Sequence, residues 1–465
     1  MNSKLKITFY GGAGSVTGAN FLLEELPDAV AGVKGMKILF DCGLVQGGRL
    51  CEGINCEKMP YDSTTIDYLI ISHAHLDHIG RIPKLVKEGF KGRILSTPPT
   101  REITAVMLED SMGLLGKDAK ANNVEPLYNE DDVRRSMELW DEGISYHKEF
   151  SLGNFKVRFL DAGHILGSAM TELTYNGKKI VYTGDLGNSP NVLLNDTETI
   201  TDADYLIVES VYGDRNHEPH NMSKDMLEDA IENTVNKKGV LMIPAFSIEK
   251  TQEILYEISK MMEESRIPLV KVFLDSPLAI KVTDIYKKYS SYFNQGTVEH
   301  GKRHPDEGMF SFPQLVRTLK TEESIAIKNA SNPKIIIAGS GMSNGGRILH
   351  HEKNYLSDKK NTLLVTGYQS VGTLGRLIQE GTKSIRIMGE TVNVEAGIVS
   401  ITGYSGHKGS DDLLEFVSHM ADKVKKVFVV LGEPKSSTFM AQRIRDNLAI
   451  DAHTPSYGES FELEV

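Results

Sequence analysis

The first two hundred residues alternate short apolar segments with turns. Each segment is four or five residues long and ends at a polar or glycine-rich junction, as β-strands commonly do. The strands predicted in this way are residues 37–40, 68–72, 156–160, 179–183 and 205–208. Between the second and the third, residues 101–142 carry apolar side chains three and four positions apart, which predicts helices.

From residue 221 onward the pattern becomes a regular alternation of helix and strand. Helices are predicted over residues 224–236 and 250–264, and strands over residues 240–244, 270–274, 334–338 and 362–366. Strands spaced by helices in this way predict a parallel sheet. The chain has no internal repeat and no low-complexity tract, so motifs must set the domain limits.

Length and composition predict a soluble protein of more than one domain. A chain of 465 residues is long for one compact domain, so we expect two domains or one domain with a large insertion. No apolar run reaches the roughly 18 residues that a membrane span needs, so no membrane partner is predicted. The N-terminus enters a strand pattern without the features of a signal peptide, which predicts a cytoplasmic location.

Charge and cysteine content narrow the picture further. The net charge of −11 argues against nonspecific binding of nucleic acid, but a basic cleft or bound metal ions would still allow a local RNA site. The three cysteines are an odd number, which argues against a disulfide framework. We therefore expect Cys42, Cys51 and Cys56 to be free thiols.

The strongest chemical signal is the segment SHAHLDHIG, which directly follows the apolar run 68–71. Extended backbone points His73 and His75 to the same side, so both can bind one ion. A helix predicted from residue 77 to residue 89 would place Asp77 and His78 on its first turn. Imidazole and carboxylate ligands without thiolate suit zinc, and manganese or iron are alternatives.

Two later strand ends repeat this arrangement. The segment FLDAGH places His164 after an apolar run and a glycine, and VYTGD does the same with Asp185. Either residue alone would be read as a turn residue. Their order behind the first motif makes both candidate ligands, and Asp185 could bridge two metal ions.

The segments HAHLDH, GHILGSA and TGDLG together resemble the metallo-β-lactamase superfamily. This resemblance implies an α/β fold, the αββα sandwich, with metal ions at one edge. It also matches Asp41 in LFDCG to an aspartate that lies behind the ligands and fixes their orientation.

Two further blocks resemble the β-CASP nucleases of this superfamily. VESVYGD at residues 208–214 is followed by about 160 residues of α/β pattern, and the chain returns with TGYSGH at residues 402–407. The resemblance implies an α/β β-CASP domain inserted into the metallo-β-lactamase domain. The predicted limits are residues 1–208 for the first part, 209–376 for the insertion and 377–465 for the return segment.

The resemblance also implies a set of site residues. His73, His75 and His164 would bind one zinc, Asp77, His78 and His407 the other, and Asp185 would bridge them. A hydroxide between the ions would attack phosphorus. The residues implied in catalysis are Asp41, Asp77, Asp185 and Glu209; Glu209 would orient a ligand or relay a proton. A histidine at position 407 is typical of the RNA-cutting members.

The segment IIIAGSGMSNGGR, residues 335–347, ends an apolar run with glycines, serines and an arginine. Its backbone N–H groups and the Arg347 guanidinium suit phosphate oxygens, although the glycines could serve only a tight turn. Its resemblance to bacterial β-CASP ribonucleases favours phosphate binding. The predicted substrate contacts are Ser340, Gly341, Gly345, Gly346, Arg347, His350 and His351.

The sequence departs from the family at two positions. Leu377 stands where relatives carry a histidine that is thought to act as general acid, and Leu431 stands where many carry a histidine before Gly432 and Glu433. His350, His351 or a metal-bound water could supply the missing proton, and the sequence does not choose between them.

These observations predict a zinc-dependent ribonuclease that binds two Zn²⁺ ions and cuts single-stranded RNA in a cleft between two domains. Endonuclease action is expected, with 5′-exonuclease activity and homo-oligomer formation left open. The alternatives are a hydrolase of thioesters, lactams or other phosphodiesters, and a non-catalytic RNA-binding subunit. A dinucleotide site at residues 9–18 is rejected, because the glycine spacing is too long and a strand follows.

Overall fold

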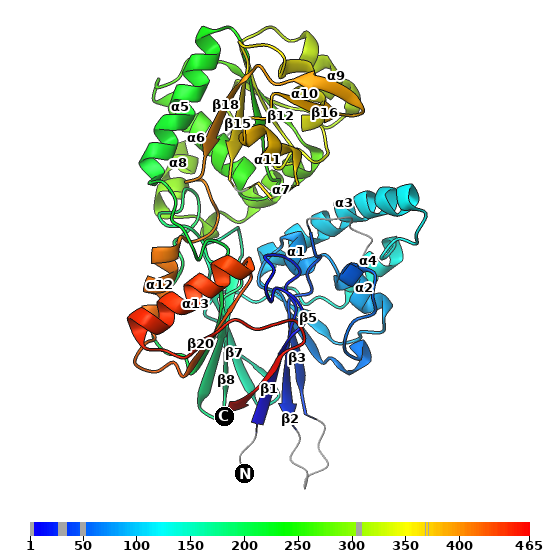
Figure 1. The fold of residues 1–465 in the computed structure, drawn as a ribbon, viewed down its shortest axis with the longest axis vertical. Coiled ribbons are helices and arrows are strands. Elements are labelled where there is room, and N and C mark those ends of the chain that lie inside the picture. Colours follow the sequence, from blue (N-terminus) through cyan, green and yellow to red (C-terminus); the bar gives the residue numbers. More distant parts are fainter. Residues whose placement is uncertain (1–3, 27–34, 47–52, 304–308, 368, 371) are drawn as a thin grey trace. The chain divides into compact units, whose positions relative to one another are not determined.

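The structure is a computed structural model of the chain, which describes residues 4–26, 35–46, 53–303, 309–367, 369–370 and 372–465. It divides into two compact units, each with its own core (Figure 1). Unit 1 comprises residues 1–191, 195–216 and 407–465, and unit 2 comprises residues 192–194 and 217–406. The chain therefore leaves unit 1 after Asn216 and returns to it at His407.

Unit 1 is built on two sheets. The first has the order β21-β1-β2-β3-β4-β5, and its strands are β1 (Lys4–Phe9), β2 (Phe21–Leu26), β3 (Lys37–Phe40), β4 (Tyr68–Ile70), β5 (Arg93–Leu95) and β21 (Ser460–Glu464). The second has the order β20-β19-β10-β9-β8-β7-β6, and its strands are β6 (Phe150–Leu152), β7 (Phe155–Asp161), β8 (Ala169–Tyr175), β9 (Lys178–Tyr182), β10 (Tyr205–Glu209), β19 (Lys426–Val430) and β20 (Ala452–His453).

The two sheets pack face to face through one apolar core. Alternate residues of each strand point into it, as the period of two in a strand requires. Phe9, Phe21 and Phe40 enter from the first sheet, and Phe159 and Phe428 enter from the second. The sandwich thus forms because strands far apart in the sequence share one buried face.

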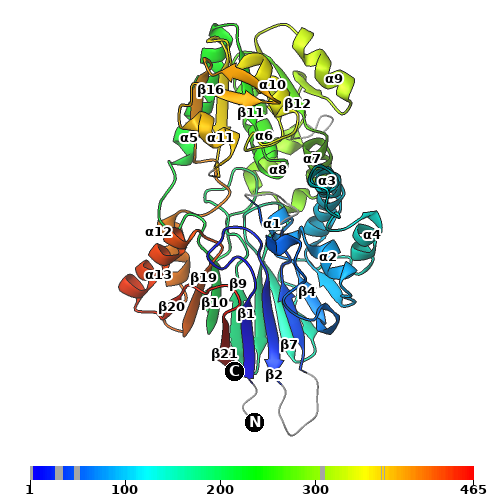
Figure 2. The same cartoon turned by 45° about the vertical axis from the view of Figure 1, so that its right-hand side comes forward.

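Helices cover the outer faces of the sandwich, which confirms the predicted αββα architecture (Figure 2). They are α1 (Leu76–Ile79), α2 (Ile82–Lys87), α3 (Pro98–Asn122) and α4 (Glu130–Glu138) near the first sheet, and α12 (Ser410–Ser418) and α13 (Pro434–Leu448) against the second. Short 3-10 turns lie at Gly53–Asn55 and Ser63–Thr65. Leu413, Phe416 and Ile444 of α12 and α13 pack on Val181 and Val427, which explains how the return segment docks.

The single helix predicted over residues 77–89 is wrong, because the structure contains the two short helices α1 and α2 there. The Asp77 carbonyl accepts a hydrogen bond from the Ala19 N–H (2.9 Å), and the Arg81 N–H donates to the Cys42 carbonyl (2.8 Å). The bond that would continue α1 is therefore missing. Pro83, which has no N–H to donate, stands in the first turn of α2.

Unit 2 contains a six-stranded sheet of order β13-β12-β14-β11-β15-β18, and all its pairings are parallel, as the helix–strand alternation predicts. Its strands are β11 (Val240–Pro244), β12 (Lys271–Asp275), β13 (Leu315–Arg317), β14 (Lys334–Ala338), β15 (Thr362–Thr366) and β18 (Gly397–Ile401). A separate hairpin is formed by β16 (Ser384–Ile387) and β17 (Glu390–Asn393).

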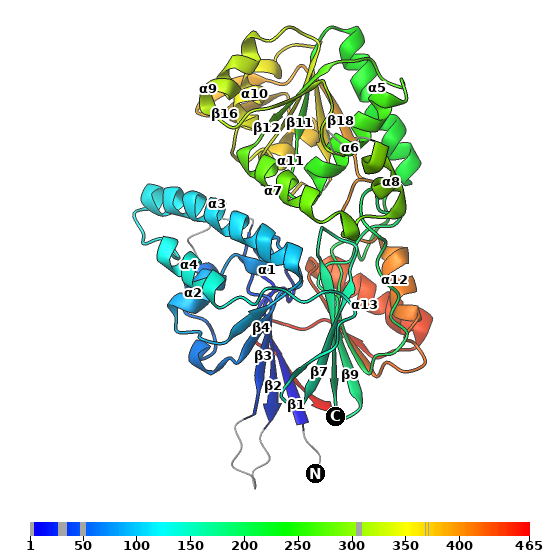
Figure 3. The ribbon, with the colours of Figure 1, turned by 180° about the vertical axis from the view of Figure 1, so that it is seen from behind.

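Helices flank both faces of this sheet (Figure 3). They are α5 (His220–Asn236), α6 (Lys250–Glu263), α7 (Pro277–Lys288), α8 (Gln295–Arg303), α9 (Thr321–Ala326), α10 (Ile348–Tyr355) and α11 (Leu374–Gln379), with 3-10 turns at Ser290–Tyr292 and Ile327–Asn329. Leu241 and Ile243 pack on one side of β11, and Val240 and Met242 pack on the other. This explains why the strand reads as a continuous apolar run.

The structure also bears on the cysteines and on the length of apolar helices. Cys42 is buried and Cys56 is exposed, and both are free thiols; Cys51 lies outside the described residues. No helix in the described part of the chain is long and apolar enough to cross a membrane.

Candidate metal centre

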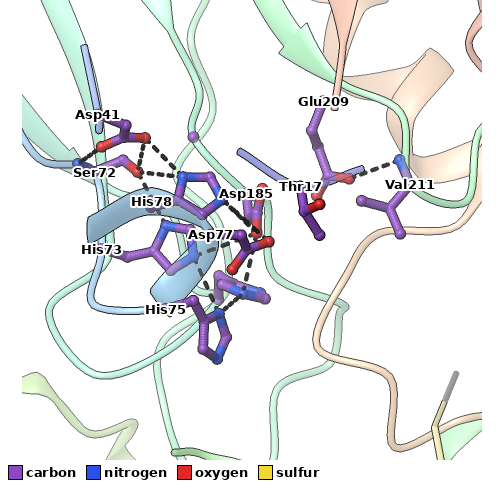
Figure 4. Close-up of polar contacts among 12 residues, drawn as sticks. Thr17, Asp41, Ser72, His73, His75, Asp77, His78, Asp185, Glu209 and Val211 are labelled. Atoms are coloured by element: carbon purple, nitrogen blue, oxygen red, sulfur yellow. Dashed lines mark hydrogen bonds and ion pairs between the residues drawn. The ribbon is translucent and has the colours of Figure 1, made fainter. Parts of the chain in front are cut away.

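Strand ends of unit 1 bring the predicted ligands together at one edge of the sandwich. His73 follows β4, His164 follows β7, Asp185 follows β9, and Glu209 is the last residue of β10. The two sheets meet at this edge, because the Ala169 N–H donates to the Ser72 carbonyl (2.8 Å). Residues separated by more than one hundred positions thus share one site (Figure 4).

The first group of candidate ligands has the spacing of a metal site. His73 Nε2 lies 3.1 Å from His75 Nδ1, which lies 3.2 Å from His164 Nε2. Asp185 Oδ2 lies 3.3 Å from His73 Nε2 and 3.6 Å from His164 Nε2. Ligands about 2.0–2.1 Å from a tetrahedral ion stand about 3.4 Å apart. These four side chains therefore have the donor types and spacing that fit one divalent ion.

The His78 ring provides a further candidate ligand atom. Its ring is fully buried, its Nδ1 lies 2.7 Å from Asp41 Oδ2, and its Nε2 has no hydrogen-bond partner among the described residues. A proton on Nδ1 would be donated to Asp41, which leaves the lone pair on Nε2 free. That nitrogen lies 3.4 Å from Asp185 Oδ2, so it can share an ion with this carboxylate.

Asp41 is the buried centre of the contacts behind the ligands. Its Oδ1 accepts from the Ser72 N–H (2.8 Å), and its Oδ2 accepts from the hydroxyls of Ser72 (2.7 Å) and Tyr182 (2.6 Å) as well as from His78. The Ser72 hydroxyl also lies 3.0 Å from His73 Nδ1. One carboxylate thus orients two histidine rings, directly and through a serine.

A second group consists of Asp185, Glu209 and His407, whose donor atoms lie within 4.8 Å of one another. Glu209 Oε1 accepts from the Leu186 N–H (2.8 Å) and lies 3.1 Å from His407 Nδ1. Asp77 stands slightly apart, with its Oδ2 4.0 Å from His78 Nε2. The structure therefore brings all seven predicted ligands to one region and places Glu209 against the His407 ring.

The electrostatics of the cluster favour metal-binding protonation states at the first group. Burial, followed by the His78 ring, lowers the pKa of His73 to about 3, so its imidazole is neutral. Burial raises the pKa of Asp185, but His78 and His73 outweigh this effect and hold its pKa well below the usual value. Burial lowers the pKa of His407, whereas the Glu209 carboxylate raises it to about 9. The first group thus offers the neutral imidazoles of His73 and His75 beside the ionised Asp185 carboxylate, whereas His78 and His407, whose pKa values are raised by neighbouring carboxylates, must release a proton to bind an ion.

A left-handed backbone conformation and a close approach to the Ser72 side chain explain the glycine in the TGD motif. Gly184 has a φ of +56°, and a Cβ there would lie 2.6 Å from the Ser72 Cβ. Only glycine tolerates both conditions without strain. This contact seats Asp185 directly against the loop that carries His73.

Several residues that support the ligands were not singled out from the sequence. The Tyr182 hydroxyl bonds to Asp41, and the Ser168 hydroxyl accepts from the His164 N–H (3.0 Å). Buried Asp161 accepts from the Gly163 N–H (2.9 Å), and burial raises its pKa to about 7. All three lie within or beside the quoted motifs, and their position there is the only sequence signal that could have identified them.

The glycine-rich segment of unit 2 forms a loop between β14 and α10. Its carbonyls face protein donors: Gly339 accepts from the Ile348 N–H (3.0 Å), Gly341 from Gln369 Nε2 (3.0 Å), and Met342 from the Gly375 N–H (3.1 Å). The backbone N–H groups of Gly341, Gly345 and Gly346 have no acceptor among the described residues. Such a loop is suited to an anion.

Arg347 and His351 both contact Asp275, a buried carboxylate at the end of β12. Arg347 donates to Asp275 Oδ1 (2.7 Å) and to the carbonyls of Thr318 and Leu319 (2.9 Å each), and His351 Nε2 lies 2.7 Å from Asp275 Oδ2. Burial raises the pKa of Asp275, but its donors lower it to about 2. His350 is exposed, as is part of Ser340. Arg347 and His351 thus brace the loop from within unit 2.

Comparison with known proteins agrees with this geometry. The chain matches the metallo-β-lactamase superfamily over residues 32–245, the Beta-Casp domain over residues 251–378, and the Zn-dependent metallo-hydrolase RNA specificity domain over residues 391–455. Ribonuclease TTHA0252 of Thermus thermophilus is 35% identical over 413 residues, which cover 89% of this chain and 90% of the relative. The chain belongs to the β-CASP family. This confirms the resemblance read from the motifs.

Other relatives of the β-CASP family span most of the chain as well. An RNase J-like protein of Methanocaldococcus jannaschii is 32% identical over 91% of this chain and 93% of its own length. The transcription termination factor FttA of Methanosarcina mazei is 28% identical over 99% of this chain and 72% of its own. A solved structure of a protein of unknown function from Enterococcus faecalis V583 shares the fold, with a TM-score of 0.56, 13% identity and coverage of 99% and 100% of the two chains.

Proposed function

We propose that this chain is a ribonuclease that requires two divalent metal ions, with zinc as the ion suited to its ligands. The observation that carries the proposal is the set of four donor atoms of His73, His75, His164 and Asp185 at tetrahedral spacing. Two relatives similar over nine-tenths of the chain are named as a ribonuclease and an RNase J-like protein, which supports RNA as the substrate.

The proposal assigns distinct tasks to the side chains of unit 1. His73, His75 and His164 would hold one ion, Asp77, His78 and His407 the other, and Asp185 would contact both. Asp41 keeps the free lone pair of His78 on Nε2 through its contact with Nδ1. Glu209 orients the His407 ring through its 3.1 Å contact with Nδ1. These supports keep the ligands in place before an ion binds.

When bound, the ions would lower the pKa of a coordinated water and offset negative charge on the phosphate. The surrounding residues keep the ligands in their positions and in the protonation states that bind metal ions. Burial keeps the His73 ring neutral, and Asp185 remains ionised beside His73 and His78. A neutral imidazole and a charged carboxylate are the forms that bind metal ions.

In unit 2, the proposed phosphate contacts are the N–H groups of Gly341, Gly345 and Gly346, together with the half-buried Ser340 and the exposed His350. Arg347 and His351 would support the loop and not contact the phosphate, because both side chains bind Asp275. The loop follows β14 at the C-terminal edge of a parallel sheet, the edge where ligands of such sheets bind.

The proposal is tested by comparing substrates in parallel. Single-stranded RNA labelled at either end, DNA of the same sequence, a thioester and a lactam are incubated with the protein before and after chelation, and again with zinc restored. We expect RNA to be cleaved only with metal present, and the two labels to separate internal from terminal cutting. Turnover of a thioester or lactam but not RNA would contradict the proposal.

A further inference from the structure

An aromatic ring lies on the glycine-rich loop of unit 2 and takes no part in the chemistry assigned so far. Phe246 follows β11 and is 37% exposed, which makes it one of the exposed large apolar side chains of the chain. It stands beside the loop because β11 and β14 are neighbouring parallel strands whose C-terminal ends share one edge.

One face of the Phe246 ring lies against the backbone of Gly341. A Cβ at Gly341 would lie 2.6 Å from Phe246 Cδ2, 2.7 Å from Cε2 and 2.9 Å from Cγ. Three ring atoms at nearly equal distance place that point over the ring face, since a point at the ring edge would lie much farther from Cγ. One face of the ring is therefore occupied by the loop, and the exposure belongs to the rest of the residue.

The ring and the loop are held in place from both sides. The Ala245 N–H donates to the Ala338 carbonyl (3.0 Å), and the Thr251 hydroxyl donates to the Phe246 carbonyl (2.7 Å). Gln369 Nε2 donates to the Gly341 carbonyl (3.0 Å). The part of Phe246 that remains exposed is apolar surface, and covering such surface is favourable.

We infer that Phe246 is a stacking platform for a nucleobase of an RNA strand whose phosphate is held by the adjacent loop. The inference rests on the proposed ribonuclease function and on phosphate binding by the Gly341–Gly346 loop. Single-stranded RNA is recognised largely by bases that stack on aromatic side chains while backbone groups bind phosphate. The juxtaposition of the Phe246 ring with unpaired N–H groups of the loop provides both kinds of contact within one unit.

The chemistry of the contact sets its specificity. Every base offers an aromatic face, so stacking on Phe246 would tolerate any sequence. The contact would require an unpaired base, because a base within a duplex has both faces stacked already. The platform would therefore favour single-stranded over double-stranded RNA without reading its sequence.

The test measures KM and kcat for cleavage of a short single-stranded RNA by the wild type and by the Phe246→Leu and Phe246→Trp variants. Phe439→Leu serves as the matched control, because Phe439 is 48% exposed on α13 in unit 1. We expect Phe246→Leu to raise KM roughly tenfold with kcat little changed. Phe246→Trp should restore the wild-type KM, and the control should leave it unchanged.

A second arm uses RNA in which one base at a time is removed to leave an abasic sugar. In the wild type, one abasic position should raise KM by roughly the same tenfold, and in Phe246→Leu the same position should add nothing further. An unchanged KM in Phe246→Leu, or an abasic effect that persists in that variant, would overturn the platform while leaving ribonuclease activity intact. Absence of RNA cleavage by the wild type would instead overturn the proposed function and this inference with it.

Discussion

The candidate metal centre of unit 1 and the glycine-rich loop of unit 2 are built on the same plan but from different chemical groups. Both lie where strands end at one edge of a sheet. The metal centre is made of side chains, and a buried carboxylate, Asp41, orients two of them. The loop offers backbone N–H groups, and a buried carboxylate, Asp275, braces the residues behind them.

The comparison teaches that the candidate metal centre and the proposed phosphate loop have the same kind of support. In each, a carboxylate with almost no exposed surface gathers several donors from separate elements. Asp41 contacts Ser72, His78 and Tyr182, and Asp275 contacts Thr318, Ser324, Arg347 and His351. The two sites differ in the groups that face the ligand: carboxylate and imidazole side chains would face a cation in unit 1, and backbone N–H groups would face a phosphate in unit 2. Substitutions in the two sites should therefore have different effects.

The largest effect is expected when a side chain of the metal centre is removed. His75→Ala should abolish RNA cleavage, by at least about 1,000-fold, since the charge stabilisation that a bound ion supplies amounts to several kcal/mol. Metal content measured by mass spectrometry should fall with activity. His350→Ala is the control for metal content, because His350 is an exposed histidine, and this variant should retain both ions. Full cleavage by His75→Ala would contradict the assignment of His75 as a ligand.

A smaller loss is expected from the residue behind the ligands. Asp41→Asn should weaken metal affinity about 10- to 100-fold, because His78 and Ser72 lose a charged acceptor. Affinity is measured by competition with a chelator. The control is Asp204→Asn, which changes another buried carboxylate of unit 1 that contacts Lys178 and Lys179 instead of the ligands. Equal metal affinities in the two variants would show that Asp41 does not support the ligands, and the comparison between the two sites would fail.

The matching change in unit 2 should leave metal binding untouched. Asp275→Asn should raise KM for RNA about tenfold, with kcat and metal content unchanged, because it loosens Arg347 and His351 behind the loop. Unfolding by denaturant should show a loss of about 2–3 kcal/mol, as expected when a buried charged partner is weakened. A fall in kcat with KM unchanged would show that the loop does not act through substrate binding.

The last effect concerns stability and involves Glu352, a fully buried residue of α10 that accepts a hydrogen bond from the Ser343 hydroxyl in the loop. Burial raises the pKa of Glu352 from 4.5 to about 8. Because the folded pKa lies above the unfolded one, stability is fully present below about pH 4.5 and is lost as the pH rises toward 8.

Glu352→Gln removes this titration. The variant and the wild type should have similar free energies of unfolding at pH 5, and the variant should become more stable, by roughly a few kcal/mol, at pH 8.5. Denaturant titrations at the two pH values provide the measurement. A constant difference between the proteins at both pH values would show that the carboxyl does not titrate in this range.

The metal centre could be predicted from sequence to a large extent, and the loop only in outline. His73, His75, His164 and Asp185 each follow an apolar strand, so the sequence pattern places them at strand ends. Tyr182 reads simply as a strand residue, and its bond to Asp41 appears only when the two sheets pack together. The pairing of Asp275 with Arg347 likewise depends on the neighbouring places of β12 and β14 in the sheet.

Local hydrogen bonds explain the main error in the fold prediction. The apolar spacing after His78 continues as in a helix, but the Asp77 carbonyl is taken by Ala19. That contact comes from a residue nearly sixty positions away, which no local pattern can contain. The same break sets the turn in which Asp77 and His78 stand, so it contributes to the site itself.

The central claim, that the gathered side chains hold two metal ions that cut RNA, is tested most directly by counting ions and measuring cleavage in the same samples. Mass spectrometry of the wild type and of His407→Ala gives metal per chain, and end-labelled single-stranded RNA gives activity. We predict two ions per wild-type chain, one in the variant, and cleavage only in the wild type. Fewer than two ions in an active wild type, or undiminished cleavage by the variant, would contradict the account.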